Sequence, residues 1–217
     1  MIPVILIVGE KASGKTSLME KLIAELSRRG LRVGAFKHSS HHLDFDREDK
    51  DTGRFARAGA HAVAASSDSM VVFYCTTEEL WDPERLRDRF FEKVDILLGE
   101  GFKQAPFPKI AVLQKGEDIS KYKDHGLLAV VADARIKSEL PRFSMDEIDS
   151  LADLLEKQIR LKKGKREVTL YVNGRKIKIK PFIKEFFLNT ISAMVASLRD
   201  TEKASRIIIT IDQAENK

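Results

Sequence analysis

The sequence VILIVGEKASGKTS, residues 4–17, joins an apolar run to a loop that contains two glycines, a lysine and hydroxyl side chains. The loop fits the pattern G-x-x-x-x-G-K-[ST], which binds nucleotide phosphates where a strand precedes it and a helix follows it. Its backbone N–H groups would surround a phosphate, the Lys15 ammonium would add positive charge, and the Thr16 hydroxyl would reach Mg²⁺. We therefore predict nucleotide binding, rather than a plain glycine-containing turn, by Gly9, Lys11, Ala12, Ser13, Gly14, Lys15, Thr16 and Ser17.

Short apolar runs alternate with helical patterns over the first 160 residues. The runs lie at 4–8, 32–36, 62–65, 70–74, 95–98, 109–113 and 127–132. Because their hydrophobicity is continuous rather than alternating, they indicate strands buried on both faces, as in a mainly parallel sheet covered by helices. The predicted fold class is α/β, with a P-loop nucleotide-binding domain over residues 1–160.

Three helices of this domain are predicted from residues that favour helix ends. The first should end at Gly30, which suits a left-handed cap. An N-cap followed by proline starts the second, and a capping box starts the third. The three start signals are Gly14-Lys15, Asp82-Pro83, and Ser144 with Glu147.

A polar linker at residues 160–166 precedes a second predicted unit, a small basic α+β domain over residues 166–217. Asn173-Gly174 accepts the positive φ angles of a type I′ turn and predicts a β-hairpin. Pro181 opens a predicted helix, and the run at 206–211 is predicted to be a strand. The expected order is therefore ββαβ.

The composition places the chain among soluble globular proteins, since 43% of the residues are hydrophobic and 33% are charged. Cys75 is the only cysteine, so no internal disulfide can form and the cytoplasm is the expected compartment. The apolar run at 2–8 is too short to span a membrane and lacks the basic start of a signal peptide. We expect no membrane association.

Positive charge is concentrated in one segment of the chain. Residues 157–184 contain eleven Lys or Arg residues against Glu167 alone. Such a segment attracts anions, including nucleic acid, acidic proteins and phosphorylated small molecules. Because no RNA-binding motif or aromatic interleaving accompanies it, we favour a solvated surface over nucleic-acid binding.

A second acid is expected near the metal. Asp95 and Glu100 stand at opposite ends of one predicted strand, and ligands bind beyond the carboxyl ends of parallel strands. Asp95 would lie roughly 16 Å from that edge. We therefore predict that Glu100, between Gly99 and Gly101, orders Mg²⁺ or a water molecule, rather than being a solvated loop carboxylate.

Residues 37–54 follow the second predicted strand and are rich in His and Asp. His38, His41, His42, Asp44 and Asp46 could form a metal site, yet no established zinc pattern fits their spacing. We favour contact with substrate or phosphate over a transition-metal site.

The choice of base has a weak sequence signal. Proteins that read guanine often carry Asn/Thr-Lys-x-Asp after a strand, where the acid accepts the N–H donors of the base. Here the run at 109–113 is followed by Gln114-Lys115-Gly116-Glu117, in which only the lysine is retained. The motif gives weak support to GTP, and an ordinary polar turn explains it equally well.

Several segments between residue 1 and about residue 115 together resemble the molybdopterin-guanine dinucleotide biosynthesis protein B (MobB) family. The phosphate loop alone is common to many nucleotide-binding proteins, whereas its combination with a Lys-His strand end, a KD-S/T element and an EGFK strand end is specific. The matching stretches are GEKASGKTSLMEKLI at 9–23, RVGAFKHSSHH at 32–42, DFDRE at 44–48, KDTGRFARAGA at 50–60, GEGFK at 99–103 and FPKIAV at 107–112.

The resemblance implies that Lys15 and Thr16 bind a triphosphate and Mg²⁺, and that Glu100 acts with Lys15 in any catalysis. It also implies that the site is lined by Lys37, His38, Asp46, Lys50, Asp51 and Thr52. The implied activity is that of a homodimeric, GTP-binding adapter with weak GTP hydrolysis, which assists a molybdopterin guanylyltransferase or binds a molybdopterin-type ligand. The chain departs from the family at Gln114, where an arginine is common.

A second class of function uses the same loop. In a P-loop small-molecule kinase or a metal-handling NTPase, the histidines at 38, 41 and 42 would bind the acceptor or the metal. Phosphoryl transfer to an acceptor would favour this alternative, and GTP-dependent association with a guanylyltransferase would favour the adapter.

Overall fold

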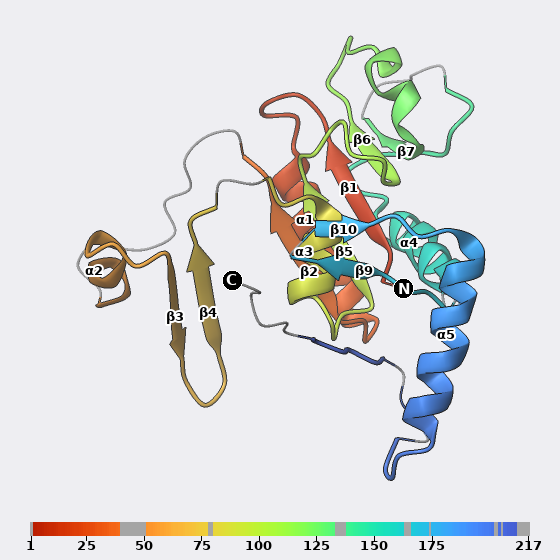
Figure 1. The fold of residues 1–217 in the computed structure, drawn as a ribbon. Helices are drawn as coiled ribbons and strands as arrows, with labels where there is room; N and C mark the ends of the chain where they lie inside the picture. Colours follow the sequence, from red (N-terminus) through yellow and green to blue (C-terminus); the bar gives the residue numbers. More distant parts are fainter. Residues whose placement is uncertain are drawn as a thin grey trace. The chain divides into compact units, whose positions relative to one another are not determined.

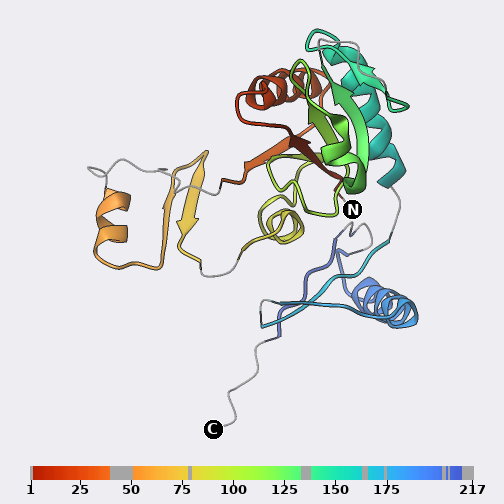
Figure 2. The ribbon, with the colours of Figure 1, turned by 90° about the horizontal axis from the view of Figure 1, so that it is seen from above.

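The computed structural model describes residues 2–39, 51–77, 80–132, 138–162, 166–173, 175–201, 204 and 206–211, with the backbone alone for 123–125. The chain divides into two compact units, Ile2–Lys162 and Lys163–Lys217. Figures 1 and 2 show the elements of both units from two directions.

A six-stranded sheet forms the centre of the first unit, in the order β2-β5-β1-β6-β7-β8 (Figure 1). All of its neighbouring strands pair in parallel. Its strands are β1 (Val4–Val8), β2 (Val33–Lys37), β5 (Ile96–Glu100), β6 (Lys109–Val112), β7 (Leu127–Val131) and β8 (Arg142–Phe143). The predicted α/β class with a mainly parallel sheet is confirmed. The strand β8 has only two residues, too few to show a pattern in the sequence.

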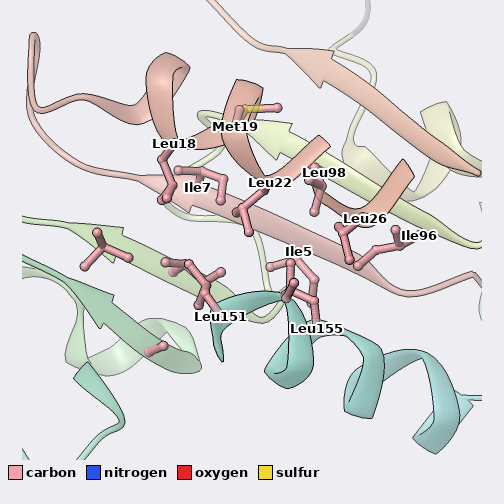
Figure 3. Packing of buried hydrophobic residues seen from close by; sticks show 14 of the residues in the cluster. Ile5, Ile7, Leu18, Met19, Leu22, Leu26, Ile96, Leu98, Leu151 and Leu155 are labelled. Carbon is pink, nitrogen blue, oxygen red and sulfur yellow. The ribbon is translucent and has the colours of Figure 1, made fainter. Parts of the chain in front are cut away.

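Two helices, α1 (Lys15–Arg28) and α4 (Ile148–Lys162), cover one face of this sheet. Figure 3 shows Leu18 and Leu22 of α1 and Leu151 of α4 close to Ile5 and Ile7 of β1, and all five side chains are fully buried. Each such side chain contributes about 1.5–3 kcal/mol through burial. This layer fixes the start of α1 against the end of β1, and so fixes the loop between them.

The opposite face of the sheet has its own core. Leu6 and Leu97 pack there with Tyr122 from a short 3₁₀ helix, η1 (Ile119–His125). Phe91, which follows helix α3 (Pro83–Phe90), packs against the same cluster. The central strands β1, β5 and β6 are therefore buried on both faces, as their continuous apolar runs predict, whereas β2 at the sheet edge has exposed residues.

Two of the three predicted helix starts, at Lys15 and Pro83, are observed, whereas the third helix begins only at Ile148, four residues after Ser144. In α3, Asp82 Oδ1 accepts a hydrogen bond of 2.8 Å from the Arg85 N–H, and before α4 the Ser144 N–H donates to Glu147 Oε2 at 2.8 Å. The first helix begins at Lys15 and ends at Arg28, two residues before Gly30, which has a φ of 82°.

The runs at 62–65 and 70–74 do not belong to the parallel sheet, so their predicted placement is wrong. They form a separate antiparallel hairpin of β3 (Ala62–Ser66) and β4 (Val71–Cys75). The four residues between them can close a hairpin but cannot make the long crossover that a parallel pair requires. A short helix that was not predicted, α2 (Asp51–Arg57), precedes the hairpin.

The second unit contains the predicted hairpin and helix: β9 (Leu170–Val172), β10 (Arg175–Ile177) and α5 (Pro181–Ala196). Val172 pairs with Arg175 across the two-residue loop, and Asn173 has a φ of 50°. Arg166 Nη2 joins the hairpin side to the helix by donating to the Leu188 carbonyl at 3.2 Å.

Among the residues that the structure describes, 206–211 pair with no other strand, so the third strand predicted for this unit is not observed there. Its isoleucines are largely exposed; for example, Ile211 is 78% exposed. β-Branched residues favour a strand only when a neighbouring strand supplies hydrogen bonds. Within the described part of the chain, no helix has the length and apolar character needed to cross a membrane.

Candidate nucleotide-binding site

The loop between β1 and α1 forms one wall of a pocket of about 430 Å³. Three lysines and one carboxylate carry the charge of this pocket, so its surroundings favour an anionic ligand. The lining residues are Lys11, Ala12, Ser13, Gly14, Lys15, Thr16, Ser17, Lys37 and Glu100.

Glycine is required at two positions of the loop. A Cβ atom on Gly9 would lie 2.4 Å from the carbonyl oxygen of Val112, which belongs to the backbone of β6 and cannot move aside. Gly14 is the N-cap of α1 and has a φ of 90°, a conformation that residues with side chains rarely adopt. The two glycines that define the sequence pattern therefore allow the loop to turn closely around the sheet edge.

Several donor groups of the loop face the pocket or lie beside it. Lys15 Nζ donates to the Glu10 carbonyl oxygen at 2.6 Å, which holds the ammonium over the loop. The Ser13 hydroxyl is buried and, in the described part of the chain, has no hydrogen-bond partner. A buried hydroxyl without a hydrogen-bond partner destabilises the fold, so a bound ligand that accepts a hydrogen bond from Ser13 would remove this cost.

Glu100 lies at the carboxyl end of β5, as predicted. Its Oε2 accepts a hydrogen bond of 2.9 Å from the Thr16 hydroxyl, and its Oε1 lies 3.8 Å from Lys37 Nζ. The parallel register explains this meeting, because Glu100 is opposite Ile7 of β1 on one side and opposite Lys37 of β2 on the other. The Glu100 side chain is only 13% exposed.

Thr16 and Glu100 fit the requirements of a Mg²⁺ ion that is bound together with a phosphate ligand. Mg²⁺ at such sites takes one or two protein oxygens and completes its shell with water and phosphate oxygens. Among the described residues, no group of three or more His, Cys, Asp or Glu side chains could hold a metal by itself.

Asp95, the other acid considered for the metal, lies before the opposite end of β5. Its carboxylate binds the side chain of Arg32 at 3.1 Å and also accepts a hydrogen bond of 2.8 Å from the Arg32 N–H. Asp95 therefore joins β5 to the chain before β2, away from the pocket edge.

His38 lies next to the pocket, although it is not among the lining residues. The backbone N–H of His38 donates to the Glu100 carbonyl oxygen at 2.8 Å. The imidazole ring of His38 stacks on the ring of Phe102, with the ring centroids 4.1 Å apart. Phe102 has a φ of 52° and follows Gly101, whose added Cβ would lie 2.9 Å from the His38 carbonyl oxygen. Phe102 was not predicted from the sequence, although its place in the EGFK segment at 99–103 is a signal for it.

The remaining predicted residues are not brought to the pocket within the described part of the chain. Asp51 and Thr52 lie in α2, where Asp51 pairs with Arg54 at 3.6 Å and the Thr52 carbonyl accepts a hydrogen bond of 2.8 Å from the Tyr74 hydroxyl. Their role at the site stays a prediction. Asp46, Lys50, His41 and His42 lie outside the described residues.

Gln114 contacts the loop between β1 and α1, a contact that was not predicted from the sequence. Its Nε2 donates to the Lys11 carbonyl oxygen at 3.3 Å. Gln114 directly follows the strand run of β6, which neighbours β1 in the sheet. Its position after a strand was noted, but the partner of its side chain could not be read from the sequence.

Comparison with known proteins gives consistent matches to adapter proteins of molybdopterin-guanine dinucleotide biosynthesis. An adapter protein of molybdopterin-guanine dinucleotide biosynthesis from Haemophilus influenzae is 35% identical over 158 residues, which cover 71% of this chain and 88% of that protein. The Escherichia coli protein of the same name is 29% identical over 170 residues, covering 76% of this chain and 97% of that protein.

Solved structures agree. The crystal structure of Bacillus subtilis MobB superposes with a TM-score of 0.63 and 30% sequence identity, covering 76% of this chain and all of that chain. The family profile described as molybdopterin guanine dinucleotide synthesis protein B matches residues 4–133, which include the phosphate loop and Glu100. The chain belongs to the molybdopterin guanine dinucleotide synthesis protein B family.

Proposed function

We propose that this protein binds GTP and Mg²⁺ in the pocket and acts as an adapter, with slow GTP hydrolysis, in the formation or delivery of molybdopterin-guanine dinucleotide. One observation carries the proposal: the Thr16 hydroxyl and the Glu100 carboxylate meet at 2.9 Å in the pocket that Lys15 lines. The adapter role is supported by the names of the H. influenzae and E. coli relatives.

Each group in the pocket has a part in holding the nucleotide. The loop amides, the N-terminus of α1 and Lys15 would bind the phosphates, and Thr16 and Glu100 would hold Mg²⁺. Bound Mg²⁺ neutralises negative charge on the phosphate oxygens. Lys37, 3.8 Å from Glu100, balances the carboxylate and limits the negative charge near the phosphates.

The same pocket supports slow rather than fast hydrolysis. Fast GTPases use an arginine and a water-orienting glutamine beside the γ-phosphate. Among the described residues that line the pocket there is no arginine and no glutamine. Glu100 is already engaged by Thr16 and Lys37. Slow hydrolysis suits an adapter, because the GTP-bound state then lasts long enough for a partner protein to bind it.

The proposed partners are a molybdopterin guanylyltransferase, or a molybdopterin-type ligand, and a second copy of the chain. The hairpin of β3 and β4 offers an apolar surface for the second copy: Met70, Val71 and Val72 are 63%, 72% and 51% exposed. Exposed apolar strands of this kind are typical of association surfaces. The lone Cys75 fits a reducing cytoplasm as the compartment.

The experiment that tests the proposal has two measurements on the full chain. GTP with Mg²⁺ at a hundred times its dissociation constant should stabilise the folded protein by about 2.7 kcal/mol, seen as a rise in melting temperature that chelation of Mg²⁺ reduces. In the same state the protein should bind a molybdopterin guanylyltransferase more tightly than it does without nucleotide. Transfer of the γ-phosphate to a small-molecule acceptor would instead support the kinase alternative.

A further inference from the structure

A carboxylate stands beside the phosphate loop, outside the pocket described above. Glu117 belongs to the loop that follows β6, and β6 is the neighbour of β1 in the sheet. This loop and the phosphate loop therefore leave the same edge. They are also joined directly, because Gln114 Nε2 donates to the Lys11 carbonyl oxygen at 3.3 Å.

The Glu117 side chain is held in a defined orientation by two donors. Its Oε2 accepts a hydrogen bond of 3.1 Å from the Gln114 N–H, and its Oε1 accepts one of 3.0 Å from the Tyr122 hydroxyl. Tyr122 is 2% exposed, and its burial, together with the bond to Glu117, raises the pKa of its hydroxyl. The hydroxyl therefore remains a donor throughout the physiological range.

The two donors leave Glu117 with further capacity. Each oxygen of an ionised carboxylate can accept two hydrogen bonds, so one position on each oxygen remains for a ligand. Glu117 is only half-buried, which leaves it accessible. A ligand that offers two adjacent N–H donors would use both positions.

Guanine has this arrangement and adenine does not. The Watson–Crick edge of guanine carries the N1–H donor beside the N2 amino group, whereas adenine presents the acceptor N1 beside a single amino group. A carboxylate only accepts, so it pairs with the first edge and repels the second. Ligands lie across the carboxyl edge of a parallel sheet, so a base can extend from the phosphate loop toward the loop after β6.

We propose that Glu117 selects guanine over adenine by accepting the N1–H and N2–H₂ donors, with Gln114 and Tyr122 as positioning residues. The inference rests on the proposed function, since it requires a nucleotide in the phosphate loop. The segment Gln114-Lys115-Gly116-Glu117 would then have a role in base recognition, in addition to forming a turn. Compared with Asn-Lys-x-Asp, the amide and the acid are each longer by one methylene group and keep their order.

The test is titration of the full chain, with Mg²⁺ present, against GTP, ITP, XTP and ATP. Two hydrogen bonds to a charged acceptor predict that GTP binds at least about 100-fold more tightly than ATP. Hypoxanthine lacks the 2-amino group, so ITP should bind about tenfold more weakly than GTP. Glu117→Gln should weaken GTP about 10- to 100-fold, leave ATP unchanged, and strengthen XTP about tenfold, because an amide can donate to the 2-oxo group.

Two further variants make the test specific. Tyr122→Phe keeps the buried ring but removes the donor to Glu117, so it should lower the ratio of GTP to ATP affinity by about three- to tenfold. This variant carries the test where Glu117→Gln fails to fold. Glu92→Gln makes the same chemical change on the exposed end of the segment after α3 and should leave all four affinities as they are.

The outcomes separate this inference from the proposed function. Equal affinities for GTP and ATP, or an unchanged base preference in a folded Glu117→Gln protein, would overturn the inference alone. A chain that binds none of the four nucleotides would overturn the inference together with the phosphate site itself.

Discussion

Thr16 and Glu100 are 84 residues apart in the chain, yet their side-chain oxygens lie 2.9 Å apart. Two structural conditions produce this contact: α1 begins where β1 ends, and β5 pairs with β1 so that Glu100 stands opposite Ile7. The contact places a hydroxyl and a carboxylate together at the phosphate loop. A Mg²⁺ ion that accompanies GTP would be held by both groups.

Replacement of either residue should remove most of the Mg²⁺ dependence of GTP binding. Thr16→Val removes the hydroxyl ligand of Mg²⁺, and Glu100→Gln removes the charge of the carboxylate ligand. GTP binds more tightly with Mg²⁺ than without it, and in each variant this increase in affinity should be about 10- to 100-fold smaller. Calorimetric titration with Mg²⁺ and with a chelator measures this gain. Asp95→Asn, at the opposite end of β5, is the matched control and should behave as the unmodified protein; equal loss in all three variants would argue against a specific metal site.

At the residue scale, much of the site could be predicted from the sequence. The pattern at Gly9, Gly14, Lys15 and Thr16 specified the loop, and the position of Glu100 at the end of a strand specified the acid. The bond from Gln114 to Lys11 and the stack of His38 on Phe102 could not be predicted, because each depends on loop conformations that are set by neighbouring strands.

The two helices on one face of the sheet are joined by a network of charged side chains. Arg29, at the end of α1, binds Asp153 of α4 at 2.6 Å and Glu156 of α4 at 3.0 Å. It also binds Glu25 within α1 at 2.5 Å. The network fixes α1 against α4, so it supports the helix whose N-terminal residues line the candidate nucleotide-binding pocket.

This network should make stability depend on pH in the acid range. Hydrogen bonds from Arg28 and then Arg29 lower the pKa of Glu25 to about 2 from its ordinary value of 4.5. Because the folded pKa is the lower one, ionised Glu25 stabilises the fold above pH 4.5, and this contribution is lost as the pH falls toward about 2. Urea unfolding from pH 6 to pH 3 measures the effect.

Glu25→Gln is the comparison for this prediction. The difference in free energy of unfolding between the unmodified protein and Glu25→Gln should be largest near pH 6 and should shrink as the pH is lowered. A difference that stays constant between pH 6 and pH 3 would show that Glu25 is not stabilised by its arginine partners.

At the element scale, the sequence predicted helix starts better than strand partners. Asp82 caps α3 directly, and Ser144 bonds Glu147 just before α4, so local sequence is sufficient for such signals. The partners of β3 and β4 depend on the length of the connection between them, and their apolar runs alone did not distinguish a hairpin from two strands of the main sheet. Residues 206–211 show the same limit, since a strand also needs a partner.

The whole molecule combines a family domain with a second unit that lies beyond the matched residues 4–133. The described chain exposes apolar side chains on the hairpin of β3 and β4, where Val71 is 72% exposed and Phe73 is 47% exposed. A single chain with this surface would be prone to association. The proposed homodimer would cover it.

Light scattering during size-exclusion chromatography tests this proposal. The unmodified protein should have twice the mass of one 24.5 kDa chain, and the double substitution Val71→Asp with Val72→Asp should convert it to single chains, because two buried charges at an interface are strongly unfavourable. Leu161→Asp is the matched control, since Leu161 is 56% exposed at the end of α4. Dimers that persist in the double variant would exclude the hairpin as the interface.

Lys15→Ala tests most directly whether the loop from Gly9 to Thr16 binds the phosphates of GTP. Titration with GTP and Mg²⁺ should show an affinity about 10- to 100-fold lower than that of the unmodified protein, since a charged donor to the phosphates is lost. Lys93→Ala, an exposed lysine before β5, should bind GTP normally. A folded Lys15→Ala protein that binds GTP as tightly as the unmodified chain would contradict the account.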